Sequence, residues 1–498
     1  MTHFGFHPQW VSMIMRCVTS ARFSVKLNVA LSRSFLPSRG LRQGDPLSPY
    51  LFLFCVEGFL ALLKKAQNDK KLAGVKFGST GPHITHLLFA DDSIVFLEGT
   101  RENMEMLKQI LVKYEKASGQ KVNLQKSSIF FGKGSQDVMK EQMKQIVGIQ
   151  SEALSERYLG LPTLVGRSKE GTFKHVTECA KGKVCGWKGQ GLSKAAREVL
   201  VKSVLQATPT YTMSCFHLSK KMCRNLTSIS SKFWWGAMNG ERKVHWIAGQ
   251  KMCASKRAGG MGFRDPEAFN RALLAKQAWR ILQVPNSLCA RVLKARYFKD
   301  ESILSASCPA SGSFTFRSIL HGRDLLREGL IWRIGSGTNI NIHHDAWIPR
   351  NGSTKPLGQV YIQGITKVSH LMNPDGRSWN EELVDQMFIV ADAIDVKQIA
   401  IGGLAMDDLL AWNFTRDGVF TVRSAYHFRM SLNRARSGQP EPSSSAAMHK
   451  GYLSLWDTNA PGKVKIHMWR MIHNGLAVGA ELHRRRIKPG VFCVVCAR

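Results

Sequence analysis

Two adjacent aspartates between two apolar runs constrain this chain more than any other feature. Leu87–Ala90 is a short apolar run that predicts a buried strand, and Ser93–Leu97 predicts the strand that returns. Asp91 and Asp92 therefore stand on a tight turn, where two carboxylates repel each other unless a cation lies between them. Hard divalent cations bind carboxylate oxygens, and two such ions about 3.5–4 Å apart can hold the attacking and leaving oxygens of a phosphoryl transfer. A solvated turn is the alternative interpretation, because Asp is a common turn residue.

The sequence on either side favours the metal-binding interpretation. Residues 38–52 read SRGLRQGDPLSPYLF, in which two glycines allow a ligand to approach the backbone closely. Arg39 and Arg42 suit phosphate or nucleic acid, and the Asp-Pro pair that follows predicts a helix that starts at residue 46. Downstream, residues 119–131 read GQKVNLQKSSIFF.

In this order and at this spacing, the three segments resemble the palm of a reverse transcriptase, specifically the plant LINE-type non-LTR retrotransposon polymerases. The resemblance implies that Asp91 and Asp92 are catalytic and bind Mg²⁺ or Mn²⁺. It also implies that residues of the other two segments hold the template and the incoming nucleotide: Arg39, Gly40, Arg42, Gln43, Gly44 and Lys126. The implied partners are an RNA template, a DNA primer and deoxynucleoside triphosphates.

Blocks further along the chain resemble the same family. They lie at residues 158–162, 233–236, 259–265 and 345–349. The region 424–498 resembles the reverse-transcriptase zinc-binding domain, and Cys493-Val-Val-Cys496 within it has the spacing of half a zinc site. Because a closed structural zinc site needs four ligands, we expect an incomplete site that binds Zn²⁺ weakly or not at all.

The pattern of elements predicts an α+β chain. We expect a partial right-hand polymerase palm with the antiparallel Asp-Asp hairpin over residues 1–135, and a thumb-like and connecting helical region over 136–330. A connector of mixed strands and helices is expected over 331–423, followed by a small, truncated zinc-binding domain over 424–498.

Two expectations within these regions are more specific. A helix from Ser193 to Leu205 has an apolar and a basic face, and its cations either follow a primer–template backbone or only face solvent: Lys194, Arg197 and Lys202. The alternating residues 331–334 and 339–342 flank a Gly-Ser-Gly turn, which predicts a hairpin between them.

The acidic residues depart from the family pattern. A two-metal polymerase of this type needs a further aspartate on a strand before the segment 38–52, yet residues 1–44 contain no Asp and no Glu. The acidic residues that precede Asp91 are Asp45, Glu57 and Asp69, and none of them lies on an expected palm strand. We therefore expect that the chain begins just after the first catalytic carboxylate, is cut at both ends, and is inactive on its own.

The net charge of +34 indicates nucleic acid as the partner. Lys and Arg outnumber Asp and Glu by 70 to 36 and are spread along the whole chain, a pattern that attracts phosphate backbones through counterion release. Two alternatives to a polymerase fragment share this charge. One is a nucleic-acid-binding remnant without chemistry, and the other is a protein similar to a group II intron maturase, which has related palm motifs and a basic RNA-binding region.

Cysteine usage and hydropathy bear on the compartment. Eleven cysteines at scattered spacing argue against a disulfide framework and for a reducing compartment. The N-terminus lacks the pattern of a signal peptide, and the apolar run 51–63 is too short to span a bilayer. We expect an intracellular protein of the nucleus or the cytoplasm, without a membrane partner.

Overall fold

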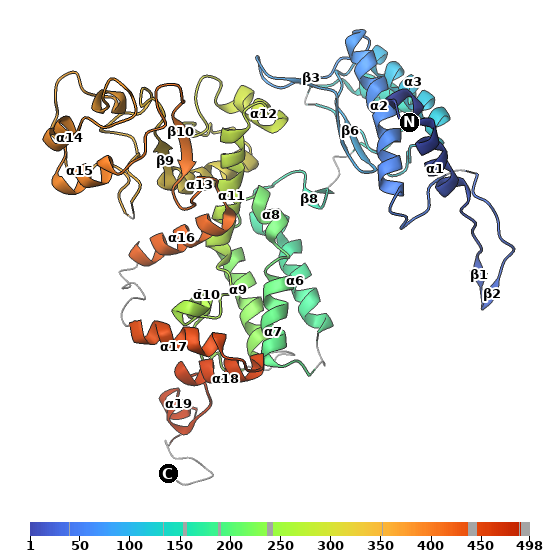
Figure 1. The fold of residues 1–498 in the computed structure, drawn as a ribbon. Coiled ribbons are helices and arrows are strands. Elements are labelled where there is room, and N and C mark those ends of the chain that lie inside the picture. Colours follow the sequence, from blue (N-terminus) through green and yellow to red (C-terminus); the bar gives the residue numbers. More distant parts are fainter. Residues whose placement is uncertain are drawn as a thin grey trace. The chain divides into compact units, whose positions relative to one another are not determined.

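The computed structural model describes most of the chain and divides it into two compact units. The described residues are 1–38, 40–132, 134–152, 157–187, 191–236, 243–350, 352–436, 446–487 and 489, and for 446–450 the description is limited to the backbone. Unit 1 comprises Met1–Leu164 and unit 2 comprises Val165–Arg498, and Figure 1 shows the elements of each. Each helix in the described part of the chain is either too short or too polar to span a lipid bilayer.

Unit 1 combines helices with short antiparallel strand pairs. Its elements in chain order are a 3₁₀ turn η1 (Thr2–Phe4), α1 (Pro8–Thr19), β1 (Lys26–Leu27), β2 (Ala30–Leu31), α2 (Ser48–Asn68), β3 (Val75–Lys76), β4 (His83–Ile84), β5 (His86–Phe89), β6 (Asp92–Val95), α3 (Arg101–Ser118), α4 (Asp137–Val147), β7 (Arg157–Tyr158) and β8 (Leu161–Pro162). Each strand pairs antiparallel with its neighbour in this order, as β1–β2, β3–β4, β5–β6 and β7–β8. The described part of unit 1 is therefore a mixed α/β structure.

The core of unit 1 lies between α2 and α3. Its buried apolar residues are Phe59, Leu63, Ala66, Leu72, Leu107 and Ile110, and side chains of β5 and β6 pack against them. Local signals set the bounds of α3, because the Thr100 hydroxyl accepts a hydrogen bond from the backbone N–H of Asn103 and Gly119 ends the helix in the left-handed region at φ 72°. Leu88 and Val95 contact this core from one side of the hairpin, whereas Leu87 and Phe89 are exposed, so the expectation of a buried strand is wrong.

Unit 2 is mainly helical. Its elements are α5 (Lys169–Thr172), α6 (Lys174–Gly186), α7 (Lys194–Leu200), a π-helical turn η2 (Val201–Leu205), α8 (Thr210–Cys215), α9 (Lys220–Trp235), α10 (Gly249–Cys253), η3 (Lys256–Ala258), α11 (Pro266–Gln283), α12 (Leu288–Tyr297), α13 (Phe314–Gly329), β9 (Leu330–Arg333), η4 (Val368–Leu371), α14 (Glu381–Met387), α15 (Val390–Lys397), β10 (Leu409–Trp412), α16 (Val422–Arg436), α17 (Ala446–Asp457), α18 (Gly462–Ile472) and α19 (Gly479–Arg484).

Two apolar clusters organise the middle of unit 2. The larger one joins α11, α13 and α16 around Phe316, Trp412 and Phe420, all nearly inaccessible to solvent. The second surrounds Trp347 and gathers apolar side chains of the segment from Ile334 to Val396. Asp265 caps α11 by accepting a hydrogen bond from the N–H of Ala268, as an Asp-Pro helix start predicts.

The prediction of a hairpin over residues 331–342 is wrong. Strand β9 pairs antiparallel with β10, so that Trp332 lies opposite Leu410, and residues 339–342 form no strand with it. The carboxylate of Asp408, next to β10, instead accepts hydrogen bonds from the backbone N–H groups of Gly335, Gly337 and Asn339. A distant strand and a buried aspartate thus provide the hydrogen-bond acceptors that a local hairpin partner was expected to provide.

Candidate metal-binding turn and nucleic-acid interface

The two aspartates of the candidate site lie together on the turn between β5 and β6. Phe89 pairs with Asp92, so that Ala90 and Asp91 alone make the connection. Ala90 has φ 49°, a left-handed conformation that costs a non-glycine residue about 1 kcal/mol or more. Both carboxylates are exposed. The strand pairing and the strained turn therefore hold two neighbouring carboxylates at the surface of unit 1.

These carboxylates fit a hard divalent cation. No ion pair of Asp91 or Asp92 occurs among the described residues, and no group of three or more His, Cys, Asp or Glu side chains with metal-binding geometry is found in this described part either. Mg²⁺ is commonly held by one or two carboxylates, and water and substrate phosphates complete its octahedral shell. Two protein ligands therefore suit an ion that is shared with a phosphate substrate.

Tyr158 is a neighbour of the Asp-Asp turn that sequence reasoning did not connect with it. It lies on β7, within the block 158–162, and burial raises the pKa of its phenol, with the Asp92 carboxylate as a second cause. The β7–β8 pair therefore lies within electrostatic range of the Asp-Asp turn. The block itself is visible in the sequence, but more than sixty residues separate it from Asp92, and no local pattern connects the two.

The glycine-rich segment 38–52 forms an exposed loop before α2. Gly40 and Gly44 have φ 86° and 84°, the left-handed region that glycine adopts at low cost. The hydroxyl of Ser48 donates a hydrogen bond to the backbone carbonyl of Arg42 at 2.7 Å, which ties the loop to the first turn of the helix. Arg42 and Gln43 are exposed, while Arg39 lies outside the described residues.

The start of α2 differs from the expectation. The helix begins at Ser48 rather than Pro46, and Asp45 is not its capping residue. Its carboxylate instead accepts a hydrogen bond from the N–H of Leu47 at 2.8 Å, within a turn that precedes the helix. The Asp-Pro pair thus forms a turn of its own before the helix, because the Asp45 carboxylate bonds an N–H within that turn and not one of the helix.

The structure gathers only some of the expected site residues in one cavity. A cavity of about 100 Å³ lies between α1 and the loop, and Gly40, Arg42 and Asp45 line it together with Cys17. Gln43, Gly44, Asp91, Asp92 and Lys126 are not among its lining residues. Lys126 is exposed in a turn after α3, where its backbone N–H donates to the carbonyl of Asn123. Cys493 and Cys496 lie outside the described residues.

The basic segment formed by α7 and the turn η2 of unit 2 gives two of its cations partners within that unit. The ammonium of Lys194 donates to the backbone carbonyl of Trp234 at 2.7 Å and lies 5.1 and 5.3 Å from the ring centres of Trp234 and Trp235. Lys202 forms an ion pair with Glu198 at 2.6 Å. Burial, with the charges of Arg197, Arg470 and Lys243 as weaker causes, lowers the pKa of Lys194 to about 7. Lys194 and Lys202 therefore have partners inside unit 2.

The C-terminal helices are anchored on the glycine-rich block 259–265. The Gly259 carbonyl accepts hydrogen bonds from the Trp469 indole N–H at 2.8 Å and from the His473 Nε2–H at 2.7 Å. Gly259 has φ 78°, and a Cβ atom there would lie only 2.7 Å from the ring of Tyr452. Burial lowers the pKa of His473, which favours the neutral ring. The block thus anchors α18 through two hydrogen bonds and packs closely against Tyr452 of α17.

Comparison with known proteins finds one family match in the N-terminal part of the sequence and another in the C-terminal part. Residues 1–163 match the family model described as reverse transcriptase (RNA-dependent DNA polymerase), and residues 420–498 match the family described as zinc-binding in reverse transcriptase. The first match contains the Asp-Asp turn, the glycine-rich loop and Tyr158. The second contains α17, α18 and the two terminal cysteines.

Individual relatives extend the match across the chain. A provisionally named ribonuclease H protein of Arabidopsis thaliana is 31% identical over 345 residues, 68% of this chain and 54% of that protein. An uncharacterised mitochondrial protein of the same plant is 46% identical over 152 residues, 30% of this chain and 99% of that protein. A retrovirus-related Pol polyprotein from a type-2 retrotransposable element of Drosophila melanogaster is 35% identical over 96 residues, 19% of this chain and 8% of that protein.

The chain spans about half the length of the Arabidopsis ribonuclease H relative and nearly all of the mitochondrial one. The reverse-transcriptase match contains Asp91 and Asp92, and one of the relatives is named as a protein of a retrotransposable element. The chain therefore belongs to the reverse-transcriptase family of the plant-type non-LTR retrotransposons.

Proposed function

We propose that this chain carries the metal-binding turn and the nucleotide-positioning loop of an RNA-directed DNA polymerase from a non-LTR retrotransposon. The observation that supports it is the pair Asp91 and Asp92 on a strained two-residue turn. Both carboxylates are exposed and have no ion pair among the described residues, and both lie within the reverse-transcriptase match.

Each site residue has a proposed role. Asp91 and Asp92 hold Mg²⁺ or Mn²⁺, which when bound supplies the charge that stabilises nucleotidyl transfer. Gly40 and Gly44 allow the template or nucleotide to approach the loop backbone, and Arg42 and Gln43 face that ligand from exposed positions. Lys126 contributes positive charge for the triphosphate, and the family resemblance assigns Arg39 to the template.

The arrangement of domains follows from the same proposal. Residues 1–135 form the partial palm, 136–330 a thumb-like and connecting helical region, 331–423 a connector and 424–498 the zinc-binding domain, in which Cys493 and Cys496 take part. The helices of unit 2 support a thumb-like role, because they place basic residues on long elements after the palm. The partners are an RNA template, a DNA primer and deoxynucleoside triphosphates.

The proposed polymerase activity requires every carboxylate that holds the two metal ions. We therefore propose that residues 1–498 alone do not extend a primer. In-line transfer with two metal ions needs carboxylates that hold both ions. The described part of the chain brings two carboxylates to the turn and no larger ligand group.

Mn²⁺ binding tests the proposed metal site. Electron paramagnetic resonance titration of the full chain, with a deoxynucleoside triphosphate present, is expected to show bound Mn²⁺ that is lost when Asp91→Asn and Asp92→Asn are combined. A control with Glu57→Gln and Asp69→Asn removes two exposed carboxylates elsewhere in unit 1 and is expected to keep the ion. If both variants bind Mn²⁺ equally, the Asp-Asp turn is not the metal site.

A nucleic-acid-binding role without chemistry is the second candidate. It is favoured by the charge of unit 2, where 49 Lys and Arg residues stand against 23 Asp and Glu residues. A chain that binds RNA tightly but shows no Mn²⁺ bound at the turn would support this candidate over the first. The retrotransposon relative and the zinc-binding match weigh against the related maturase alternative.

A further inference from the structure

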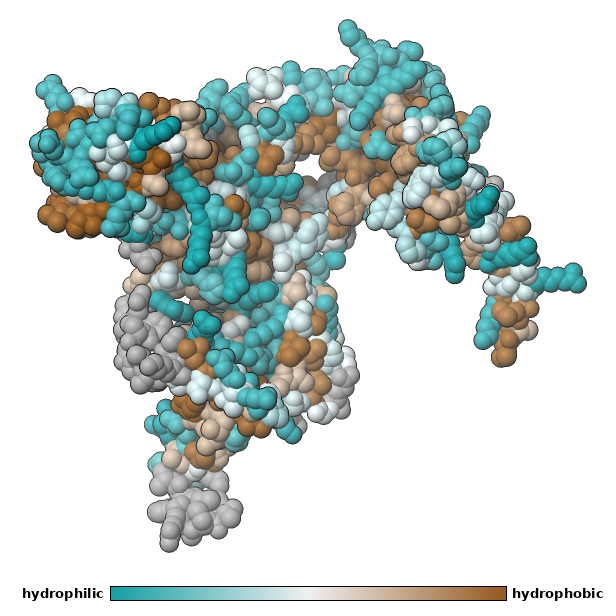
Figure 2. All heavy atoms as spheres, viewed as in Figure 1, coloured by the Kyte–Doolittle hydropathy of each residue, from teal (hydrophilic) through white to brown (hydrophobic). Residues whose placement is uncertain are grey.

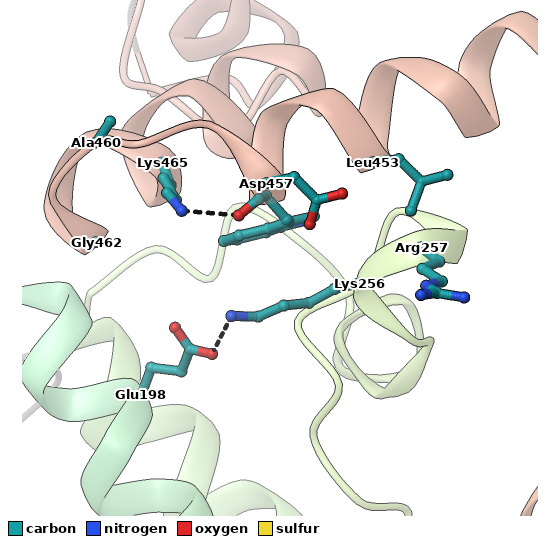
Figure 3. A pocket seen from close by; sticks show the side chains of 9 residues that line it. Glu198, Lys256, Arg257, Leu453, Asp457, Ala460, Gly462 and Lys465 are labelled. Carbon is teal, nitrogen blue, oxygen red and sulfur yellow. Dashed lines mark hydrogen bonds and ion pairs between the residues drawn. The ribbon is translucent and has the colours of Figure 1, made fainter.

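A cavity of about 460 Å³ opens in unit 2 between α7, η3 and the helices α17 and α18. Three distant stretches of sequence line it, with Glu198 from α7, Lys256 and Arg257 from η3, and residues 453–465 from the C-terminal helices. Figure 3 shows Lys256 extending across the cavity toward Glu198, with Lys465 and Asp457 on the opposite wall. Its volume falls in the range of small-molecule sites, about 300–1,000 Å³.

The acidic group in the floor of this cavity is already compensated. The Glu198 side chain is only 11% exposed and forms ion pairs with Lys202 at 2.6 Å and with Lys256 at 2.9 Å. Two lysines therefore share one carboxylate, which leaves an excess of one positive charge at the floor. A buried carboxylate with two cations fixes where those cations lie, because losing either contact would leave a charge without its partner.

The remaining polar groups of the wall are mainly donors. The Lys465 ammonium contacts a neutral acceptor, the backbone carbonyl of Trp456 at 2.7 Å. Arg257 is exposed and has no ion pair among the residues that the structure describes. A ligand that supplies acceptor oxygens would bind the Lys465 ammonium and the Arg257 guanidinium.

The aromatic wall holds one of the cations in place. The Lys256 ammonium lies 4.2 Å from the ring centre of Trp456, within the range of a favourable cation–π contact. Trp456 and Glu198 therefore hold this ammonium from two sides before any ligand arrives. Asp457 is exposed and adds one acceptor on the wall, which suits a ligand that carries a few hydroxyl or amino donors beside its anionic group.

We propose that this cavity binds one nucleotide unit of a single-stranded nucleic acid, with Lys256, Arg257 and Lys465 holding the phosphates on either side of that unit. A phosphodiester is an anion that only accepts hydrogen bonds. The hydroxyl groups of the ribose and the amino groups of the base can donate hydrogen bonds to the Asp457 carboxylate. The volume suits one unit of a strand and not the width of a duplex. This inference rests on the proposed nucleic-acid-binding function of unit 2 and adds a defined site to it.

Charge removal at matched positions tests the site. Binding of a fluorescent single-stranded 12-mer RNA to the full chain is measured by anisotropy over a range of salt. The cavity variant combines Arg257→Gln and Lys465→Gln. The control variant combines Lys276→Gln and Arg280→Gln, which removes two exposed cations of α11 that do not line the cavity. The cavity variant is expected to lose about ten-fold in affinity and about one unit of slope in log K against log salt.

A second variant acts in the opposite direction. Glu198→Gln frees the charge of Lys202 and Lys256 for the phosphate, so it is expected to tighten binding by a few-fold. Glu301→Gln, which removes an exposed carboxylate away from the cavity, is expected to have less effect. This pair keeps the test valid if the Lys465 substitution lowers the unfolding midpoint of the first variant.

The outcomes separate the site from the general function. If the wild-type chain itself fails to bind the 12-mer, the proposed nucleic-acid-binding function is wrong. If it binds and the cavity variants match their controls, only the site is wrong. An equal loss on a duplex of the same length, or a mononucleotide that occupies the cavity without competing with the strand, would also overturn the single-strand assignment.

Discussion

The two units of this protein differ in how far their large apolar side chains are buried and in how many charged residues they carry. In unit 1, large apolar side chains of the first fifty residues lie exposed, among them Phe4, Trp10, Leu27, Val29 and Leu31. Figure 2 shows hydrophobic residues along the arm that carries β1 and β2. In unit 2, four tryptophans are fully buried: Trp234, Trp347, Trp412 and Trp469.

The charge is divided just as unevenly. Unit 1 has 21 Lys and Arg residues against 13 Asp and Glu residues, whereas unit 2 has 49 against 23. Most of the +34 charge therefore lies on the unit with the denser core. The comparison teaches that the Asp-Asp turn lies on the smaller unit, in which many large apolar side chains are exposed. The residues suited to holding nucleic acid stand on the well-packed unit.

The largest expected effect concerns the charge of unit 2. Affinity of the full chain for single-stranded RNA is expected to fall by about 10³-fold between 50 and 200 mM salt, because each neutralised phosphate releases counterions. Fluorescence anisotropy at five salt concentrations measures the slope. A slope of log K against log salt near zero would mean that the excess cations of unit 2 do not contact phosphates. The difference in charge between the units would then not concern nucleic-acid binding.

The next largest effect concerns the packing of unit 2. Trp469→Ala is expected to lower the free energy of unfolding by about 3–5 kcal/mol. The variant leaves a cavity beside Trp234 and removes the hydrogen bond to the Gly259 carbonyl. Urea unfolding, followed by circular dichroism, measures the change.

Trp10→Ala in unit 1 is the matched control. This indole is 46% exposed, so its loss is expected to change the unfolding free energy by less than about 0.5 kcal/mol. Similar effects of the two substitutions would contradict the difference in packing between the units.

Sequence reasoning predicted the local parts of both units better than the distant ones. The bounds of α3 and the start of α11 follow from capping residues within a few positions of each end. The hairpin expected over 331–342 failed because the true partner of β9 lies about eighty residues further along the chain. An alternating pattern identifies a strand, but it does not identify the partner that pairs with it.

The candidate site shows the same limit. Asp91 and Asp92 could be placed on a turn from the apolar runs that flank them, whereas the nearness of Tyr158 to Asp92 depends on how unit 1 folds. Likewise, the cations of the helix expected from Ser193 to Leu205 were predicted to follow a primer–template backbone or to face solvent. The tryptophans of α9 and the carboxylate of Glu198 give Lys194 and Lys202 partners that no local pattern indicates.

A smaller effect tests how Lys194 is held in unit 2. Its pKa is lowered to about 7, first by burial and then by neighbouring cations, so the unfolded chain binds more protons than the folded one from about pH 7 up to the ordinary lysine pKa. Stability from this group therefore rises with pH across that window. Lys194→Met is expected to remove this rise, measured as the difference in unfolding free energy between pH 7 and pH 9.5. An unchanged rise would place the ammonium in solvent.

The smallest effect is expected from zinc. Because Trp469 and His473 anchor α18 on Gly259, the unfolding free energy is expected to change by less than about 0.5 kcal/mol when a chelator is added. Cys493→Ser combined with Cys496→Ser is expected to behave as the wild-type chain does. Stoichiometric zinc that survives dialysis against a mild chelator and is lost in this double variant would show that the metal site is complete.

The central proposal is that unit 2 binds nucleic acid and that Asp91 and Asp92 alone do not support nucleotidyl transfer. A primer-extension reaction on an RNA template, with Mg²⁺ and deoxynucleoside triphosphates, tests both halves when a gel-shift measurement is made on the same mixture. The account predicts a primer–template that is bound by the chain and stays unextended. Template-dependent extension by the purified chain, abolished by Asp91→Ala, would contradict it.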